Sequence, residues 1–249
     1  MGGIKDKVAV VSGVTDEIGE AISLRFADEG AKVVVCDIDQ QRVDNIVEKI
    51  KGKNQQAMGF VVNFSNPENV KKTIDEITDK LGAIDVLVNN LDESQGWEIA
   101  DVTDERWEKS LAANMNAVFY FCREIVPGMQ KNQYGRVINI SGIDYLGGPG
   151  KSNCSATKAA VFGLTRSLAL ESAKDNVTIN CVIKGDIAGS DISDEQSEKM
   201  AARIPVKKVG KPEDVAMAVN FFASESAKYV TGQMLFVCGG KSLYSSMSV

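Results

Sequence analysis

Short apolar runs rich in β-branched residues recur along the chain, and each is followed by a longer stretch in which apolar residues have helical spacing. The first run, residues 8–12, is followed by a glycine and by helical spacing over residues 18–27. Strands that are apolar on both faces must be covered on both sides. The alternation therefore predicts an α/β fold, with a parallel sheet between two layers of helices. We expect the further strands at residues 32–37, 57–63, 85–90, 136–141, 178–183 and 233–238.

The length of the chain favours one domain. With 249 residues and 44% apolar content it can bury a sizeable core, and residues 1–249 show no repeat, linker or low-complexity segment. Residues 184–204 fit the alternation least well. Glycines and a run rich in serine, aspartate and glutamate predict a mobile loop there that carries a short helix.

Charge and cysteine content argue against several classes of function. The formal net charge of −6 and the lack of a Lys/Arg cluster argue against a nucleic-acid partner. No apolar run approaches the ~20 residues that a membrane span needs, and the first residues lack a signal-peptide core. The five cysteines are widely spaced and there is no histidine, so neither a metal site nor a disulfide framework is expected. We expect a soluble, cytoplasmic protein without a membrane partner.

The turn after the first strand reads Ser-Gly-Val-Thr-Asp-Glu-Ile-Gly over residues 12–19 and opens a helix, which is where a dinucleotide pyrophosphate would bind. The chain resembles the short-chain dehydrogenase/reductase family along nearly its whole length, because this motif is followed in order by Asp37, Asn89, Asn90, Asn114, Ser141, Lys158, Gly239 and Gly240. The resemblance implies a Rossmann-like, doubly wound parallel sheet of about seven strands, a nicotinamide cofactor and a Ser-Tyr-Lys-Asn site for hydride transfer.

The resemblance assigns cofactor binding in the glycine motif to Gly13, Glu17, Ile18 and Gly19. Glu17 replaces the middle glycine, and a carboxylate within ~4 Å of a phosphate costs roughly 4 kcal/mol at an effective dielectric constant of about 20. We expect weakened cofactor binding, and complete loss stays open because Glu17 can turn toward solvent. In a second interpretation, Asp16 and Glu17 only complement the dipole of the following helix.

Three further cofactor positions follow along the chain. Asp37 ends the second strand, where an acid accepts hydrogen bonds from the adenosine ribose and favours NAD over NADP; an ordinary turn-forming role is equally open. Asn63 lies at the family's adenine-contacting position, and Asn90 borders the cofactor. Leu91 and Asp92 then replace the family's alanine and glycine, which puts bulk and charge at this border; a tolerated change in the loop is the other interpretation.

The family's catalytic positions correspond to Asn114, Ser141, Cys154 and Lys158. Cys154 stands where the family has the tyrosine that passes a proton to the carbonyl oxygen. A thiol is shorter than a phenol and differently reactive, so we expect the proton donor to be missing. Lys158 would otherwise bind the nicotinamide ribose and lower the pKa of that tyrosine. Because the phenol is missing, a second interpretation is that Lys158 is only a solvated residue on its helix.

Other interpretations of these positions stay open. Counting back from Cys154 puts the serine at Ser141, whereas aligning the strand ends puts Gly142 there. Cys154 is a replacement acid or nucleophile in one interpretation and a core or interface cysteine in another, and Tyr145 is a possible surrogate donor. Asn114 matches the family's water-holding asparagine but also suits a capping role.

Departures from the family pattern concentrate at the cofactor and reaction positions. Lys184 replaces the proline of a Pro-Gly pair beside the nicotinamide pocket, and Gly189 falls where a threonine often binds the carboxamide. Residues 104–131, 154–173 and 233–238, through which family members usually assemble, are ordinary for the family. A chain that keeps its packing and assembly surfaces is best explained as a subunit.

The sequence thus predicts a non-catalytic subunit that assembles with an active paralogue in a heterodimer or heterotetramer. The resemblance extends to hetero-oligomeric hydroxyacyl-CoA dehydrogenases of the benzylsuccinate type, so the complex would oxidise a hydroxyacyl-CoA or similar secondary alcohol with NAD. We expect this chain to bind no cofactor, with NAD held by the partner. The alternatives are an independently active NAD-dependent alcohol/ketone oxidoreductase that uses Cys154, and a ligand-binding or regulatory module.

Overall fold

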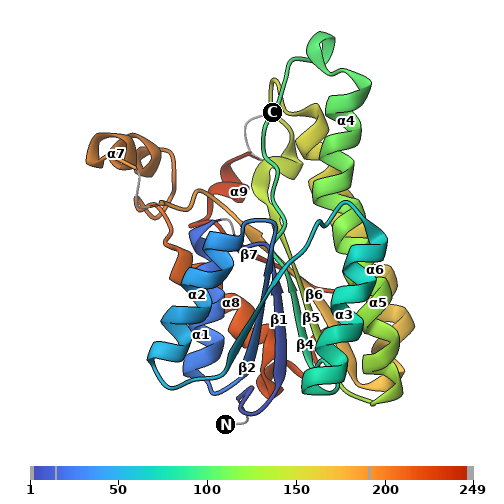
Figure 1. Cartoon of the computed structure of the whole chain (residues 1–249). Coiled ribbons are helices and arrows are strands. Elements are labelled where there is room, and N and C mark those ends of the chain that lie inside the picture. The colour runs from blue at the N-terminus through green and yellow to red at the C-terminus, as the bar shows by residue number, and fades with distance from the viewer. Residues whose placement is uncertain (1–2, 15, 190–191, 246–249) are drawn as a thin grey trace.

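Seven parallel strands form one sheet in the part of the chain that the computed structural model describes, residues 3–14, 16–189 and 192–245 (Figure 1). Their order across the sheet is β3-β2-β1-β4-β5-β6-β7. The predicted α/β sheet is confirmed, with small differences at the strand ends. The strands are β1 (Val8–Ser12), β2 (Lys32–Asp37), β3 (Ala57–Val61), β4 (Val86–Asn89), β5 (Gly135–Gly142), β6 (Val177–Lys184) and β7 (Met234–Val237).

Helices cover both faces of the sheet, as the alternating pattern predicts (Figure 1). One face carries α1 (Glu17–Asp28), α2 (Gln40–Gly52) and α8 (Pro212–Ala223). The other carries α3 (Pro67–Leu81), α5 (Ala117–Lys131) and α6 (Ser152–Ser172). The remaining α-helices in the described ranges are α4 (Asp104–Leu111), α7 (Asp194–Ala202) and α9 (Lys241–Ser245).

Side-chain caps mark where several of these helices begin. The carboxylate of Asp16 accepts a hydrogen bond from the Gly19 amide at 2.9 Å at the start of α1. At the start of α3, the Asn66 side chain accepts from the Glu68 amide at 2.9 Å, and Pro67 follows it in the first turn. Caps of this kind satisfy backbone amides that have no partner within the helix.

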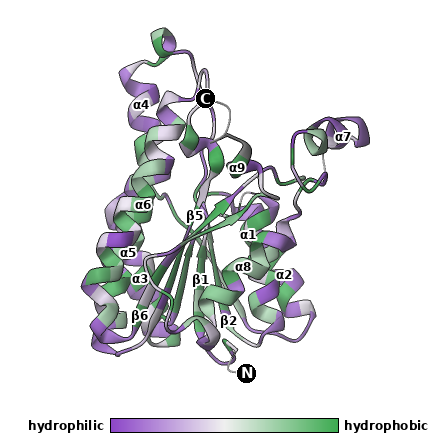
Figure 2. Cartoon of the chain, turned by 180° about the vertical axis from the view of Figure 1, so that it is seen from behind, coloured by the Kyte–Doolittle hydropathy of each residue, from purple (hydrophilic) through white to green (hydrophobic). Residues whose placement is uncertain are grey.

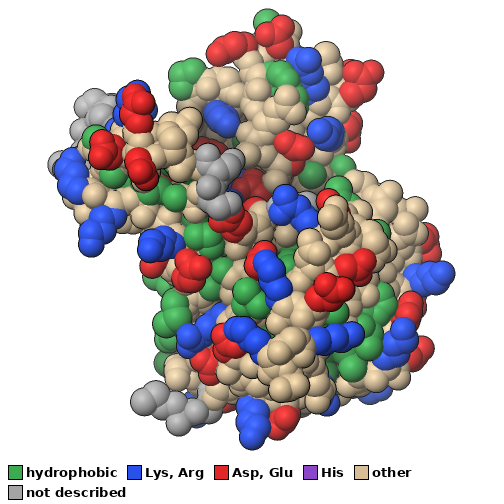
Figure 3. Space-filling view, turned by 60° about the vertical axis from the view of Figure 1, so that its left-hand side comes forward, with side chains coloured by type: hydrophobic (Ala, Val, Ile, Leu, Met, Phe, Trp, Pro, Cys, Tyr) green, Lys and Arg blue, Asp and Glu red, His purple; other side chains and the backbone are tan. Residues whose placement is uncertain are grey.

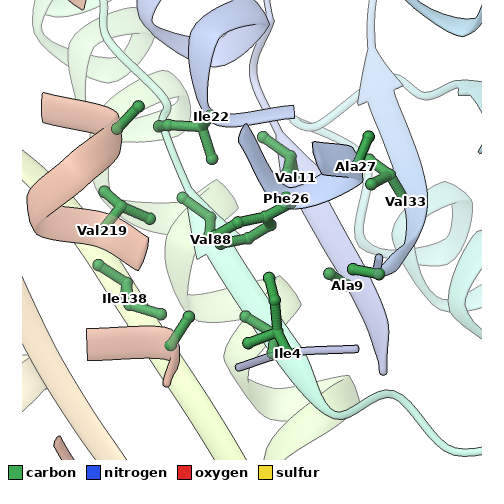
Figure 4. Close-up of a cluster of buried hydrophobic side chains, with 14 of the residues drawn as sticks. Ile4, Ala9, Val11, Ile22, Phe26, Ala27, Val33, Val88, Ile138 and Val219 are labelled. Carbon is green, nitrogen blue, oxygen red and sulfur yellow. The ribbon is translucent and has the colours of Figure 1, made fainter. Parts of the chain in front are cut away.

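The core consists of two apolar layers, one on each side of the sheet. In the α1 layer, Phe26 lies against Val11 and Val88 of neighbouring strands, and Val219 of α8 closes the cluster (Figure 4). The strands are apolar along their length, whereas the hydrophilic residues gather on the helices and loops (Figure 2). This distribution explains why the strands read as continuous apolar runs rather than as alternating ones.

Between β1 and β4, the order of the strands in the sheet departs from their order in the chain. From β1 the chain runs outward to β2 and β3, and it then returns to place β4 beside β1. In a parallel sheet this reversal leaves a crevice at the carboxyl ends of the two strands. The loops after β1 and β4 carry the glycine motif and Asp92, so the topology brings these two segments together.

Two segments extend from the body of the fold. Residues 104–131 comprise α4, a π-helical turn (Ala112–Asn116) and α5, and α4 rises beyond the sheet (Figure 1). Residues 184–204 carry the predicted short helix as α7, which projects on the other side; positions 190 and 191 lie outside the described residues.

Three further observations concern the charge distribution, the helices and the potential metal ligands of the described residues. Acidic and basic side chains are interspersed over the face that includes α7 (Figure 3). None of the described helices is long and apolar enough to cross a membrane. No group of three potential His, Cys, Asp or Glu ligands for a metal ion occurs within the described ranges.

Candidate active site

The glycine-motif turn packs directly on the loop after β4. Gly13 has a φ of 83°, and a Cβ there would lie 2.1 Å from the carbonyl oxygen of Asn90. A Cβ on Gly19 would lie 2.4 Å from the carbonyl oxygen of Gly13. Both positions therefore require glycine to let the turn and the β4 loop approach each other.

Asn90 and Asp16 join the turn to the β4 loop. The Asn90 side-chain amide donates to the Gly13 carbonyl and to the Asp16 carboxylate, both at 2.8 Å, while its own Oδ1 is buried without a hydrogen-bond partner. Ile18 is buried in the α1 layer of the core. Glu17 is the first residue of α1 and helps to line a cavity of about 520 Å³ that also includes Arg42.

Asp37 lies at the end of β2, where the resemblance predicts a contact with ribose. Its carboxylate is fully buried and accepts hydrogen bonds from three backbone amides: Val14 at 2.5 Å, Ile38 at 2.7 Å and Asp39 at 3.1 Å. In this structure Asp37 therefore ties the glycine turn to the β2 end. Asn63, beyond the shorter β3, is exposed, and its side chain accepts from the Ser65 amide at 3.1 Å in a turn.

An ion-pair network fills the crevice between the strand ends. Lys158 from α6 lies 2.5 Å from Asp92 Oδ1, and Lys184 from the end of β6 lies 2.7 Å from Asp92 Oδ2. Lys184 also lies 3.6 Å from the Asp16 carboxylate. Burial opposes ionisation of Asp92, but the two ammonium groups lower its pKa to about 2. Burial likewise works against the Lys184 ammonium, and the carboxylates of Asp92 and Asp16 raise its pKa.

This network is the part of the site that the sequence interpretation missed. Lys158 is buried and ion-paired rather than solvated, since its side chain is 3% exposed. The signal in the sequence was Asp92, an acid where the family has a small residue, together with Lys184 in place of a proline. Each of these residues suggests an obstacle to a cofactor, and the sequence does not show that Asp92 pairs with both Lys158 and Lys184.

Asn114 lies in the π-helical turn and binds the backbone after β4. Its side chain accepts from the Glu93 amide at 2.7 Å and donates to the Glu93 carbonyl at 2.8 Å and to the Thr157 hydroxyl at 3.2 Å. The π-turn widens the helix and places this amide against the loop. Asn114 therefore ties the backbone of Glu93 to the π-turn and, through Thr157, to α6.

Cys154 is fully buried under the same loop. Its sulfur lies 3.3 Å from the carbonyl oxygen of Gln95, and that oxygen also accepts a hydrogen bond from the Asn153 side chain at 2.9 Å. Burial raises the pKa of the Cys154 thiol, so the thiol stays protonated at neutral pH. These contacts agree with a core cysteine. Tyr145 packs edge-on against Phe162, with ring centroids 4.8 Å apart.

Ser141 and Gly142 were alternative positions for the carbonyl-orienting serine. Ser141 is fully buried in β5, and its hydroxyl donates to the backbone carbonyl of Lys158 at 3.1 Å. This hydroxyl therefore joins β5 to α6. Successive residues of a strand point to opposite faces of the sheet, so Gly142 points away from the face of Ser141. A glycine has no hydroxyl that could orient a carbonyl.

The structure thus brings Asn114, Cys154 and Lys158 to one side of the crevice and the glycine turn to the other. Each catalytic-position side chain is engaged within the chain: Lys158 by Asp92, Asn114 by Glu93 and Cys154 by Gln95. This arrangement has the lysine and the asparagine of the predicted site, and the residue four positions before the lysine carries a thiol instead of a phenol.

Comparisons with known proteins agree with this layout. A family model described as enoyl-(acyl carrier protein) reductase matches residues 13–242. A crystal structure of a short-chain dehydrogenase/reductase from Burkholderia xenovorans superposes with a TM-score of 0.91 at 28% identity, covering 98% of this chain and 99% of that one. This chain belongs to the short-chain dehydrogenase/reductase family.

Among the relatives of this short-chain dehydrogenase/reductase are two subunits of a named dehydrogenase. Subunit BbsC of (2S)-[(R)-hydroxy(phenyl)methyl]succinyl-CoA dehydrogenase from Thauera aromatica is 40% identical over 98% of this chain and 97% of the relative. Subunit BbsD is 35% identical over 98% and 99%. The 3-oxoacyl-[acyl-carrier-protein] reductase FabG of Thermotoga maritima is 33% identical over 95% and 98%.

Members of the family normally bind NAD(H), and the residues of this chain do not fit that group. The glycine turn and the unpartnered Oδ1 of Asn90 would suit it. However, the Asp37 carboxylate already accepts hydrogen bonds from three backbone amides, and Lys158 and Lys184 are both already paired with Asp92. A dinucleotide would have to displace a carboxylate that bridges both lysines and would bring its own phosphates near Asp16.

Proposed function

We propose that this chain is a non-catalytic subunit that assembles with a catalytically intact short-chain dehydrogenase/reductase, and that the complex oxidises a hydroxyacyl-CoA with NAD bound in the intact subunit. The observation that carries this proposal is the engagement of Lys158 by Asp92 beside a buried Cys154. A proton relay needs a donor that faces the substrate and a lysine that lowers the pKa of that donor. Here the thiol faces a backbone carbonyl, and the lysine faces a carboxylate.

The relatives support the substrate class and the subunit role. BbsC and BbsD are subunits of a dehydrogenase named for a CoA thioester that carries a secondary alcohol, and both align with nearly the whole of this chain. The 3-oxoacyl-[acyl-carrier-protein] reductases among the relatives are named for a carbonyl at the β-carbon of an acyl thioester. Oxidation of a 3-hydroxyacyl thioester gives a carbonyl at the same position. A hydroxyacyl thioester is therefore the substrate class we assign to the complex.

Two exposed apolar surfaces are available for assembly. On α6, Ala159, Ala160, Gly163 and Leu170 face outward, and Leu170 is 84% exposed. Small residues beside an exposed leucine suit close packing of a second helix. The second surface comprises the edge strand β7 and α8, with exposed Leu235, Phe236, Met217 and Phe221. Because β7 has an unpaired side, a neighbouring chain can cover this edge.

The test is co-expression of the tagged chain with a family member of the same genome that retains Tyr-x-x-x-Lys. We expect co-purification in a defined ratio by native mass spectrometry. We also expect NADH formation from a 3-hydroxyacyl-CoA by the complex and none by the tagged chain alone. Oxidation by the tagged chain alone would contradict the proposal and favour an independent oxidoreductase.

A matched pair of variants tests the assembly surface. Leu170→Asp places a charge on α6, and the loss of a buried hot-spot contact of about 2 kcal/mol would weaken assembly about 30-fold. Ile99→Asp is the control, because Ile99 is also apolar and 76% exposed but lies on the distal 3₁₀ turn (Ile99–Asp101). Equal assembly of both variants with the partner would remove α6 from the interface.

A further inference from the structure

Two lysines from different elements converge on one carboxylate in the crevice. Lys158 comes from α6 and Lys184 from the end of β6, and each binds a separate oxygen of Asp92, at 2.5 Å and 2.7 Å. The three side chains are 3%, 18% and 17% exposed, so water screens them poorly. Asp92 is thus held like a bound anion rather than like a surface ion-pair partner.

We propose that Asp92 is an intramolecular occupant of a latent anion-binding site formed by Lys158 and Lys184, and that removing its carboxylate opens this site to a phosphate-bearing ligand. This inference concerns the chain by itself and does not depend on assembly with a partner. It assigns the site a ligand class, a compact polyanion such as pyrophosphate.

The charge balance of the crevice is the first support. Without Asp92, the buried Lys158 ammonium would lose the one acid paired with it among the described residues, and within those residues Lys184 would keep only the longer 3.6 Å contact with Asp16. A buried cation without a counter-ion is strongly unfavourable, so the vacated position would favour an external anion.

The second support is space next to Lys184. Lys184 lies on the wall of the cavity of about 520 Å³, which gives access from solvent. Arg42 also lines this cavity, so the cavity has a second basic side chain besides Lys184. Asp16 and Glu17 also line the cavity and oppose an anion on that side, so the site is expected between the two lysines rather than at the start of α1.

The third support is structural. Asp92 connects the loop after β4 to α6 and to the end of β6, three segments that are far apart in sequence. In this position it performs the tethering that a bound anion would otherwise provide. We therefore expect the wild-type chain to hold its crevice together without a ligand, and the Asp92 variant to depend on one.

The experiment compares Asp92→Ala, Glu93→Gln and the wild-type chain. Glu93→Gln is the matched control, because it removes one negative charge from the neighbouring residue, whose carboxylate pairs with the exposed Lys109 at 3.2 Å. Isothermal titration and thermal shift are measured with inorganic pyrophosphate, with sodium chloride at matched ionic strength as the reference. We expect Asp92→Ala to bind pyrophosphate about tenfold or more tighter than the other two and to gain thermal stability with it.

A second variant keeps the test decisive if Asp92→Ala does not fold. Asp92→Asn preserves the shape of the side chain and removes only its charge, so it should fold and show the same preference for pyrophosphate. Adding Lys158→Met to the Asp92 variant should abolish the gained binding. Equal pyrophosphate affinity of the wild-type chain and the folded Asp92 variant, whether weak or tight, would overturn the proposal.

Discussion

Replacing Cys154 by the family's tyrosine should not convert this chain into an enzyme, because the loop over the thiol leaves no room for a ring. Cys154 is fully buried, with its sulfur 3.3 Å from the Gln95 carbonyl. Residues 93–97 are fastened above it by Asn153, which donates to Gln95, and by Lys151, which donates to the Ser94 carbonyl at 2.9 Å. The phenol must therefore push this segment outward.

The size of the effect follows from these contacts. Overpacking a filled core position costs about 1–3 kcal/mol. A loss of about 2 kcal/mol in a chain of this length lowers Tm by about 4–8 °C. The new hydroxyl would still lack an available lysine, since Lys158 stays bound to Asp92. We expect a folded, less stable variant without turnover.

The assay combines urea and thermal unfolding with NADH oxidation in the presence of a 3-oxoacyl-CoA. Cys154→Ala is the control; it only removes a sulfur and should change the free energy of unfolding by about 1 kcal/mol or less. A Cys154→Tyr variant that is as stable as the wild-type chain and reduces the thioester would refute both the packing argument and the view that Lys158 is sequestered.

Three further outcomes test the structure. The lysines lower the pKa of Asp92 in the folded chain to about 2, below its value of about 3.9 in the unfolded chain. The ionised Asp92 therefore stabilises the fold fully at pH values above about 3.9. Acid titration from pH ~5 to ~2 should then remove about 2 kcal/mol of the advantage of the wild-type chain over Asp92→Asn; a constant difference would contradict the pairing. Gly13→Ala should cost at least about 2 kcal/mol in urea unfolding, owing to its φ of 83° and the 2.1 Å approach, whereas Gly128→Ala in open space on α5 should be neutral or stabilising. Asn114→Ala should cost about 2–3 kcal/mol, since Glu93 loses two hydrogen-bond partners; an unchanged urea midpoint would show that residues 93–97 are held by other contacts.

The strands and helices expected from the sequence are present, and the differences from expectation lie at particular polar residues and turns. The expected strand at residues 57–63 ends early at Val61, because Asn63 and Asn66 form a turn and a helix cap. The side chain of Asn63 satisfies a neighbouring amide and so competes with the ladder. The long helical region at residues 104–131 is present, but the π-turn within it left no mark in the apolar spacing.

Ser141, Gly142 and Asp37 show why the identity of a residue does not by itself assign its role in the site. Ser141 and Gly142 are neighbours in sequence, yet a strand turns them to opposite faces, and the hydrophobic pattern could not decide which one faces the crevice. Asp37 has the residue type that the resemblance predicts for ribose binding. Its three amide donors come from the glycine turn and its own strand end, and they are visible only once β1 and β2 are paired.

The sequence by itself determined the alternation of strands and helices, the glycine turn and the absence of a tyrosine before Lys158. Such features depend on local propensity, apolar periodicity and residue identity, and these are properties of short segments. Only the tertiary structure decided what Lys158 does, because its partner Asp92 lies 66 residues away and the second lysine comes from the end of β6. A charge in a crevice is defined by the counter-charges that the sheet topology brings next to it, and the order of β1, β4 and β6 across the sheet sets that arrangement.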